Sequence, residues 1–377
     1  MILFVGSIGA SIRLINSLLS FKDKDPGVIV IDNKGLKIVP IIGSHQSNVQ
    51  NIAFQICNLF GGEIIETNNS VEKNFLNIDS FGNQWGWKRS GDVKDWSKLV
   101  IKQANNKEIF CSQLSGNNLW KNSEAGTTIN QLSDKNDKQN EATFHISIFS
   151  DHKNTWHPPT LWIGLGCERN TSKELIEDSL QNFLVSNNLS PLSIAGFASV
   201  DLKKDEQAIL KISKENKWPI KFFTSEELST IDVPNPSNIV LNEIGTPSVA
   251  EAACILAAGE GSKLLKEKKI FKSIDSLKNG SGAVTIAVAE SKNQYSPSAG
   301  AIHVIGSGPG DISYLTNDAR KALSKCSIWI GYKMYLDLIK PLKRGDQVLI
   351  ESNLTEEKDR CEKAIKLAEE GIKVALI

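Results

Sequence analysis

Several side chains that could bind or transform a ligand follow stretches with the composition of β-strands. Cys167 and Arg169 come after the apolar run 161–165 and before a helical pattern, which Thr171 or Ser172 is placed to cap. The free N–H groups at the start of such a helix, together with Arg169, suit an anionic group such as a carboxylate. A plain helix cap with a surface arginine is the alternative. A nucleophilic Cys167 would need a lowered pKa, so a small core thiol is the favoured interpretation.

Two more groups follow strand patterns. His45 lies at a strand-to-helix turn, where an imidazole can serve as a general acid or base, although a lone histidine at a helix start is more often structural. Asp201 and Lys203 come after the strand pattern 194–200. Acidic residues at the carboxyl ends of strands face the crevice in which α/β sheets bind ligands. Helix capping by Asp201 or Asp205 is the alternative.

A glycine-rich turn follows the apolar run 301–305, and its residues are Gly306, Ser307, Gly308, Pro309, Gly310 and Asp311. Glycine lets a backbone turn sharply and approach a ligand closely, but many such turns only connect a strand to a helix. No Gly-Lys-Ser/Thr follows, so the turn is not a P-loop. The proline breaks the spacing of a dinucleotide-binding fingerprint, and ATP and NAD are therefore disfavoured.

Composition narrows the class of protein. The 377 residues include 43 Lys and Arg and 43 Asp and Glu, and a net charge of zero argues against a nucleic-acid coat or a membrane-surface protein. The six cysteines form no C-x-x-C or zinc-finger spacing, so no metal site of the protein's own is expected, and their scatter is typical of reduced cytoplasmic thiols. No apolar run is long enough for a membrane-spanning helix. Arginine is rare, and Arg13, like Arg169, lies where a turn meets a helix, which favours carboxylate binding by a forked donor.

The elements that would position these residues alternate between strand and helix patterns, which predicts an α/β fold of several units with largely parallel sheets. The predicted units are an N-terminal α/β domain (1–75), a central region (76–158), a second α/β domain (159–290), a linker (291–299) and the start of another α/β unit (300–377). Within the central region, the polar stretch 121–140 is predicted to be a mobile surface insertion. Both chain ends fall in core-like patterns, so we expect an earlier unit to be absent and the last unit to be cut short.

Ordered motifs over most of the chain resemble those of the cobalt-precorrin-5A hydrolase family of cobalamin biosynthesis. They are the segments 6–19, 24–32, 43–45, 78–82, 86–89, 156–158, 164–172, 201–203, 233–237, 245–253 and 284–289. After the linker, the chain is similar to the start of precorrin-3B C17-methyltransferase, a tetrapyrrole methylase. The matching segments there are 304–311, 315–316, 319–323, 331–336, 360–361 and 371–377. The resemblance implies a fusion of two enzymes.

The hydrolase resemblance implies the opening of a δ-lactone on a cobalt-corrinoid ring with release of acetaldehyde. It implies no cofactor, and cobalt only as part of the substrate. Such a reaction needs a base and donors for the developing oxyanion, and His45 is the first and Asp201 the second candidate catalytic residue. The substrate carries many carboxylates, and the candidates for binding it are Arg13, Cys167, Arg169, Thr171, Ser172, Lys203, Thr246 and Ser248.

The methyltransferase resemblance implies S-adenosylmethionine as cofactor. Its expected ligands are Gly306, Gly308, Pro309, Gly310 and Asp311. The unit is expected to be incomplete here and therefore inactive. The expected partners are corrinoid and precorrin intermediates, with no nucleic acid and no membrane, and the expected location is the cytoplasm. A homodimer and contacts with other enzymes of the pathway stay open.

Two other interpretations stay open. In the first, the chain binds or hands over a tetrapyrrole without turnover, because Ser47 and Asn48 stand where the hydrolase family has a glycine pair. Tight corrinoid binding without product would favour it. In the second, the glycine-rich turn serves a nucleotide, and protection from unfolding by ATP or NAD would favour that.

Overall fold

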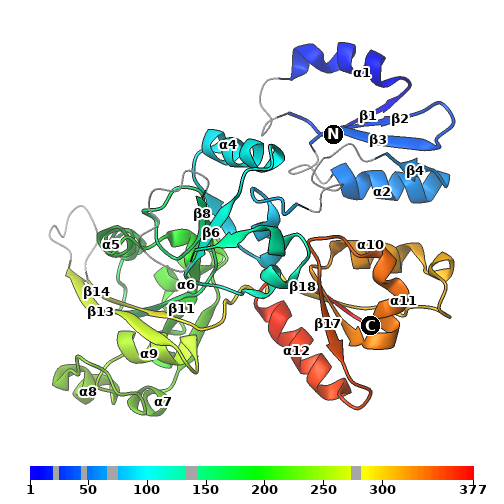
Figure 1. Ribbon diagram of the computed structural model, residues 1–377. Coiled ribbons are helices and arrows are strands. Elements are labelled where there is room, and N and C mark those ends of the chain that lie inside the picture. The colour runs from blue at the N-terminus through cyan, green and yellow to red at the C-terminus, as the bar shows by residue number, and fades with distance from the viewer. Residues whose placement is uncertain (20–24, 44–48, 66–74, 133–142, 273–281) are drawn as a thin grey trace.

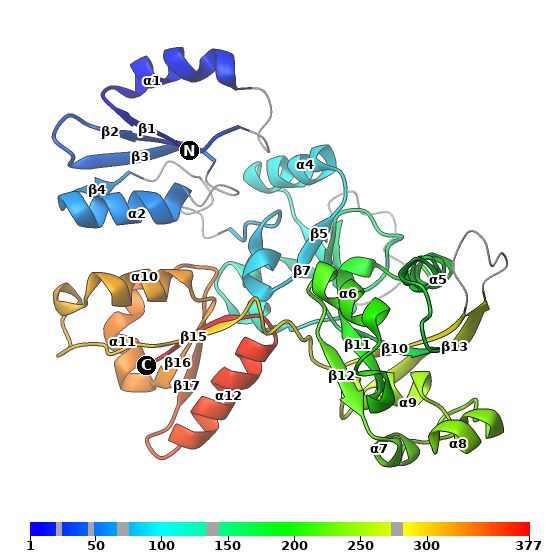
Figure 2. The same cartoon turned by 180° about the vertical axis from the view of Figure 1, so that it is seen from behind.

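Four β-sheets with helices packed against them make up the molecule (Figures 1 and 2). The computed structural model describes residues 1–19, 25–43, 49–65, 75–132, 143–272 and 282–377. Most neighbouring strands are parallel, which confirms the predicted α/β class with largely parallel sheets. Within these described ranges, no helix is long and apolar enough to cross a membrane.

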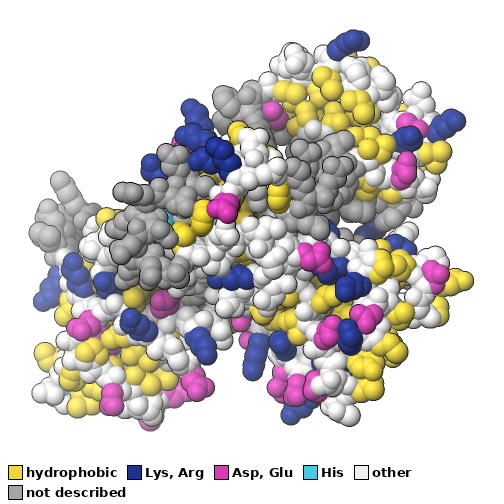
Figure 3. Space-filling view, viewed as in Figure 1, with side chains coloured by type: hydrophobic (Ala, Val, Ile, Leu, Met, Phe, Trp, Pro, Cys, Tyr) yellow, Lys and Arg dark blue, Asp and Glu magenta, His cyan; other side chains and the backbone are white. Residues whose placement is uncertain are grey.

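The first sheet has the strand order β1-β2-β3-β4. Its elements are β1 (Ile2–Val5), α1 (Ile8–Ile15), β2 (Val28–Ile31), β3 (Lys37–Ile42), α2 (Val49–Phe60) and β4 (Glu63–Ile64). Helix α2 covers one face of this sheet, where Ile29, Ile31 and Ile38 are buried. Helix α1 lies on the other side and leaves Ile12 and Leu14 exposed. Figure 3 shows the apolar surface that results at this end of the molecule.

The central region forms a sheet of order β5-β9-β8-β6-β7 around a core of buried tryptophans. Its elements are η2 (Phe81–Trp85), β5 (Lys88–Ser90), α4 (Val93–Ala104), β6 (Phe110–Gln113), η3 (Leu119–Asn122), η4 (Gly126–Thr128), β7 (Asn130–Gln131), β8 (Thr143–Ile146) and β9 (Thr155–His157). Trp85, Trp96, Trp120 and Trp156 are each at most 2% exposed. Their large apolar area explains how a segment rich in polar residues holds a core of its own.

The predicted surface insertion 121–140 is wrong over the part that is described. Residues 121–132 contain the end of η3, the short helical turn η4 and the edge strand β7, which pairs with β6. Ala125 and Ile129 are buried in the core of the central region, and the backbone N–H of Ala125 donates to the carbonyl of Gly345. The remaining residues of the predicted insertion, 133–142, lie outside the described residues.

The third sheet has the order β12-β11-β10-β14-β13. Strands β12, β11 and β10 are parallel to one another, and β14 runs antiparallel to both of its neighbours, β10 and β13. Its elements are β10 (Leu161–Cys167), α5 (Lys173–Ser186), β11 (Ile194–Val200), α6 (Gln207–Asn216), β12 (Ile220–Phe223), α7 (Ser225–Ser229), α8 (Asn238–Ile244), α9 (Ala250–Ala258), β13 (Lys263–Lys272) and β14 (Ala283–Glu290). Helices α5 and α6 pack on one face and α9 on the other. The unit is therefore a three-layer sandwich, and β13 is a strand that the sequence pattern did not predict.

The fourth sheet is all parallel, with the order β15-β18-β16-β17. Its elements are β15 (Ala301–Val304), η7 (Ile312–Tyr314), α10 (Asn317–Lys325), β16 (Ile328–Tyr332), α11 (Lys333–Ile339), β17 (Val348–Ser352), α12 (Glu357–Glu369) and β18 (Lys373–Leu376). Trp329 and Ala375 pack against α10 and α11 on one face. Ile330 and Val374 on the other face belong to the same hydrophobic core as the tryptophans of the central region. The fourth sheet and the central region therefore share one core.

The predicted linker 291–299 is a packed segment. Gln294 is 2% exposed and donates from Nε2 to the carbonyl oxygens of Trp85 and Glu370, both at 2.6 Å. Its Oε1 accepts from Trp87 Nε1 at 2.6 Å and from the N–H of Asn117 at 3.2 Å. One buried amide thus connects the central region to the end of α12.

Candidate functional site

Reactive and charged side chains meet at the carboxyl ends of β10 and β11. These strands are parallel neighbours, so the loop after Cys167 and the loop after Val200 leave the sheet side by side. The structure brings Cys167, Arg169, Thr171 and Lys203 together here. This edge of an α/β sheet is where ligands bind in such folds, and we call it the β10–β11 crevice.

Arg169 bridges the two loops of the β10–β11 crevice. Its Nη1 lies 2.5 Å from Asp205 Oδ1, and its Nη2 donates to the carbonyl of Leu202 at 2.5 Å. The hydrogen bond from Arg169 lowers the pKa of Asp205. The arginine side chain is 53% exposed, so the remaining donors of the guanidinium can reach a carboxylate from solvent.

Lys203 is placed differently from Arg169. Its side chain is only 9% exposed, and its ammonium lies 3.7 Å from Glu206 Oε2, whose side chain is 6% exposed. Such a buried ion pair holds its two loop positions in place, because breaking it would leave one charge unpaired. Arg169 Nη1 is 4.0 Å from the same Glu206 oxygen, so Glu206 orders both cations. Glu206 is not among the residues predicted from the sequence to form the site.

Cys167 is half-buried beside this charged group. Burial raises the pKa of its thiol to about 11, although Lys203, Thr171 and Arg169 act in the opposite direction. The thiol is therefore protonated at neutral pH. This geometry favours the core-thiol interpretation over a nucleophile, because the thiolate is the reactive form.

Thr171 and Ser172 order the start of α5. The hydroxyl of Thr171 donates to the carbonyl of Glu168 at 2.8 Å, and Ser172 caps the helix by accepting from the N–H of Leu175 at 3.2 Å. Thr171 is buried, and a Cβ on Gly282 would lie 2.6 Å from its hydroxyl oxygen. The two side chains therefore fix the helix start whose free N–H groups were expected to meet an anion.

Thr246 and Ser248 lie before α9 and are almost fully buried. The hydroxyl of Ser248 donates to Glu251 Oε2 at 3.3 Å, and Glu251 is 0% exposed. Asn235 Nδ2 donates to Glu251 Oε1 at 2.9 Å, so this carboxylate ties the proline-rich turn to α9. Val249, the residue after Ser248, lies close to β10, because a Cβ on Gly166 would lie 3.9 Å from Val249 Cβ.

The other predicted hydrolase residues are placed less centrally. Asp201 begins a short helical turn at the end of β11 and is half-buried. Arg13 is exposed on α1, in the first sheet's unit, and is not brought to the β10–β11 crevice. His45 lies outside the described residues, as do Ser47 and Asn48.

The glycine-rich turn lies at the carboxyl end of β15. Gly308 and Gly310 have φ values of 70° and 123°, a region that L side chains rarely adopt, so both positions need glycine. Asp311 caps the following turn by accepting from the N–H of Ser313 at 2.7 Å, and its pKa is lowered by that side-chain and backbone bonding. A Cβ on Gly306 would meet nothing within 4 Å. The turn is thus open to a ligand that approaches the backbone.

One hydrogen-bonded pair in the central region was not anticipated. Ser90 Oγ lies 2.7 Å from His157 Nε2, and His157 Nδ1 lies 2.8 Å from the carbonyl of Ser147. Burial lowers the pKa of His157 to about 4, so the ring is neutral, and Nδ1 must donate to the carbonyl. His157 is 1% exposed, and the pair joins β5 to β9. We assign it to the positioning of these strands.

No cluster of three or more His, Cys, Asp or Glu side chains in the described part of the chain is arranged to hold a metal ion. The charged groups of the β10–β11 crevice pair with one another instead. What the crevice can do chemically is bind an anion through Arg169 and the start of α5.

Comparison with known families gives two matches to this chain. The family described as cobalamin synthesis G N-terminal matches residues 1–70, and the family described as cobalamin synthesis G C-terminus matches residues 161–289. The second range contains the whole β10–β11 crevice.

Individual relatives cover both parts of the chain. A cobalt-precorrin-5A hydrolase of Priestia megaterium is 28% identical over 305 residues, which are 76% of this chain and 78% of the relative. A cobalt-factor III methyltransferase of the same organism is 42% identical over 78 residues, 21% of this chain and 14% of that protein. The solved structure of CobE, a protein of the cobalamin pathway, is 30% identical, covers 35% of this chain and 89% of its own, and gives a TM-score of 0.30.

Proposed function

Because this chain belongs to the cobalamin synthesis G family, we propose that residues 1–290 hydrolyse the lactone of cobalt-precorrin-5A and release acetaldehyde as a step of cobalamin biosynthesis. The observation that carries the proposal is the meeting of Cys167, Arg169, Thr171 and Lys203 at the carboxyl ends of two parallel strands, inside the matched range 161–289.

The chemistry divides into binding and proton transfer. Arg169 and the free N–H groups at the start of α5 bind substrate carboxylates. The Lys203–Glu206 pair holds the neighbouring loop after β11, to which Arg169 is bonded through Leu202 and Asp205. Water must lose a proton as it adds to the lactone carbonyl, and the oxyanion needs donors. His45 stays the first candidate base and Asp201 the second.

Anaerobic incubation with cobalt-precorrin-5A, with acetaldehyde measured, tests this proposal. Arg169→Met should lower kcat/KM about tenfold, mainly through KM, because it removes a charge-assisted contact to the substrate. Arg360→Met, on α12 and outside the crevice, controls for the loss of an arginine elsewhere in the chain and should leave turnover unchanged. His45→Ala should lower kcat far more than it weakens binding.

Each result has a defined meaning. Corrinoid binding without acetaldehyde from the wild-type chain would favour a protein that binds or hands over a tetrapyrrole. If the folded protein neither released acetaldehyde nor bound the corrinoid, the assignment would be contradicted. Equal KM values for Arg169→Met and Arg360→Met would remove Arg169 from substrate binding, and an unchanged kcat for His45→Ala would remove His45 from the mechanism.

The family relationship extends the proposal to residues 300–377 as part of a C17-methyltransferase that uses S-adenosylmethionine. The open glycine turn after β15 fits a ligand held close to the backbone. The residues expected to hold it are Gly306, Gly308, Pro309, Gly310 and Asp311. When bound, this cofactor would supply a methyl group. The six cysteines are all free thiols, consistent with the expected cytoplasmic location.

A further inference from the structure

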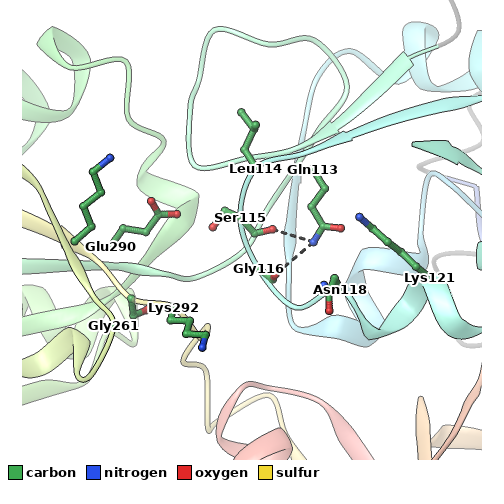
Figure 4. A pocket seen from close by; sticks show the side chains of 11 residues that line it. Gln113, Leu114, Ser115, Gly116, Asn118, Lys121, Gly261, Glu290 and Lys292 are labelled. Atoms are coloured by element: carbon green, nitrogen blue, oxygen red, sulfur yellow. Dashed lines mark hydrogen bonds between the residues drawn. The ribbon is translucent and has the colours of Figure 1, made fainter. Parts of the chain in front are cut away.

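A pocket of about 380 Å³ lies where the central region meets the third sheet (Figure 4). Residues of the loop after β6 line one side, and residues near the ends of β13 and β14 line the other. Glu290 in this pocket pairs with Leu161, whereas Val284 at the other end of β14 pairs with Cys167. The pocket and the β10–β11 crevice therefore lie about 20 Å apart, at opposite ends of the sheet.

The charges that line the pocket are predominantly positive. Lys121, Lys263 and Lys292 contribute three ammonium groups, and Glu290 is the single carboxylate among the lining residues. No ion pair joins any of these lysines to a carboxylate within the described ranges. Burial lowers the pKa of Lys121, whose ammonium lies 5.7 Å from the centroid of the Trp120 ring.

Glu290 does not neutralise this excess. Burial raises the pKa of its carboxyl, although a hydrogen bond with Ser115 and the charge of Lys263 act against that rise. One carboxylate also faces three ammonium groups, so an excess of positive charge remains in the pocket. An added anion would supply the counter-charge that Glu290 alone does not provide.

The loop that carries Ser115 and Gly116 lies between the side chains of Glu290 and Lys121 in Figure 4. Gln113 Nε2 donates to the carbonyl oxygens of Ser115 and Gly116 at 3.0 and 3.4 Å. The N–H groups of the same two residues make no hydrogen bond to any residue that the structure describes. Successive free N–H groups in a turn form an anion-binding concavity.

The turn is also fixed in place. Gly116 has a φ of 78°, and a Cβ there would lie 2.4 Å from Pro158 Cγ, so only glycine fits. Ser115 Oγ lies 3.0 Å from Thr160 Oγ1, which anchors the loop to the residue before β10. A loop held this firmly presents its donors without an ordering cost on binding.

We propose that this pocket binds a carboxylate-bearing ligand through Lys121, Lys263, Lys292 and the N–H groups of Ser115 and Gly116. A pocket of this volume takes a small di- or tricarboxylate, or carboxylate arms of a larger molecule. The assignment does not depend on hydrolysis in the β10–β11 crevice, and binding is measured without the lactone substrate.

Isothermal titration of the full chain with citrate, at constant ionic strength in chloride, tests the proposal. Lys121→Met should weaken citrate binding about tenfold, the loss of one charge-assisted contact. Glu290→Gln should strengthen it severalfold, because it removes the only negative charge and keeps a polar group beside Ser115. Lys269→Met, on the same strand as Lys263 but outside the pocket, is the matched control and should stay within twofold of wild type.

Weaker citrate binding by Lys121→Met and stronger citrate binding by Glu290→Gln support the site. If Lys121→Met is poorly folded, Glu290→Gln alone still tests the proposal. The absence of saturable citrate binding, or equal losses in Lys121→Met and Lys269→Met, would overturn it. Competition with uroporphyrin, which carries eight carboxylates on a tetrapyrrole, distinguishes a free small carboxylate from the carboxylate arms of a tetrapyrrole. Competition with citrate assigns the pocket to arms of a tetrapyrrole, and citrate binding unaffected by uroporphyrin assigns it to a free small carboxylate.

Discussion

Individual side chains in the β10–β11 crevice differ in how freely they can meet a ligand. Arg169 is exposed and uses only part of its donor set on Asp205 and Leu202, whereas Lys203 is buried against Glu206. The exposed guanidinium is therefore suited to bind substrate, and the buried ammonium to hold the loop. A sequence shows only that both are cations after strands.

The protonation of Cys167 yields a prediction at the same scale. A thiol with a pKa of about 11 is ionised to about one part in a thousand at pH 8, so iodoacetamide should label it very slowly. Labelling should rise about tenfold for each pH unit up to 11, because the thiolate fraction rises in that proportion. Exposed Cys361 is the control and should be labelled first in peptide mass maps. Labelling of Cys167 at pH 8 as fast as Cys361 would restore it as a candidate nucleophile.

At the scale of elements, the sequence predicted those strands whose two faces are both buried. Runs such as 161–165 and 194–200 are almost entirely apolar and buried because helices cover both sides of them. Strand β13 escaped prediction because it is an edge strand, and lysines such as Lys263, Lys266 and Lys269 hide its alternation. Such lysines also discourage pairing with another chain at an open edge.

The same contrast holds for the site. Cys167, Arg169 and Lys203 could be foreseen, because parallel neighbouring strands must deliver the residues that follow them to one edge. Glu206 and Glu251 could not, because burial makes them important, and partners such as Arg169 for Glu206 and Asn235 and Lys268 for Glu251 are not close in the sequence. The pocket formed with the central region was equally hidden, since no local pattern says which units touch.

Helix α9 depends on one buried carboxylate, which gives a prediction at the element scale. Glu251 accepts from Asn235 Nδ2 at 2.9 Å, from the N–H of Lys268 at 3.0 Å and from Ser248 Oγ at 3.3 Å. Glu251→Ala should lower the free energy of unfolding of the third sheet's unit by about 3 kcal/mol, because buried donors would lose their acceptor. Urea unfolding followed by circular dichroism measures this, with exposed Glu260→Ala as the control. Equal midpoints for the two variants would show that the network contributes nothing.

For the whole molecule, the most consequential contact is the one between the central region and the fourth sheet. Ile330, Val374 and Leu367 lie in the same core as the tryptophans of the central region. Gln84 Nε2 donates to Asp346 Oδ2 at 2.8 Å, and Ser327 Oγ donates to the carbonyl of Gln84 at 2.9 Å. The proposed hydrolase and methyltransferase parts are therefore packed together rather than tethered.

Substitution of Gln294 tests whether the central region and the fourth sheet unfold as one unit. Gln294→Ala would remove four hydrogen bonds at a buried junction and should lower the free energy of unfolding by about 3 kcal/mol. In this variant, the tryptophan fluorescence of the central region should change at the same urea concentration at which the amides of α12 lose protection from hydrogen exchange. The central region and α12 should respond together because they belong to one core. Exposed Asn293→Ala is the neighbouring control. Separate transitions for the two regions in the wild-type chain would contradict a shared core.

The buried junction at Gln294 also bears on how the gene can change. A gene that encodes two enzymes joined by a flexible linker can split into two genes without loss of stability, because separation exposes no hydrophobic surface on either product. Here a split between residues 290 and 300 would leave each product with an exposed hydrophobic surface that is buried in the shared core of the joined chain. The separated genes would have to be expressed in equal amounts, with their products meeting soon after synthesis, until polar residues replaced those faces.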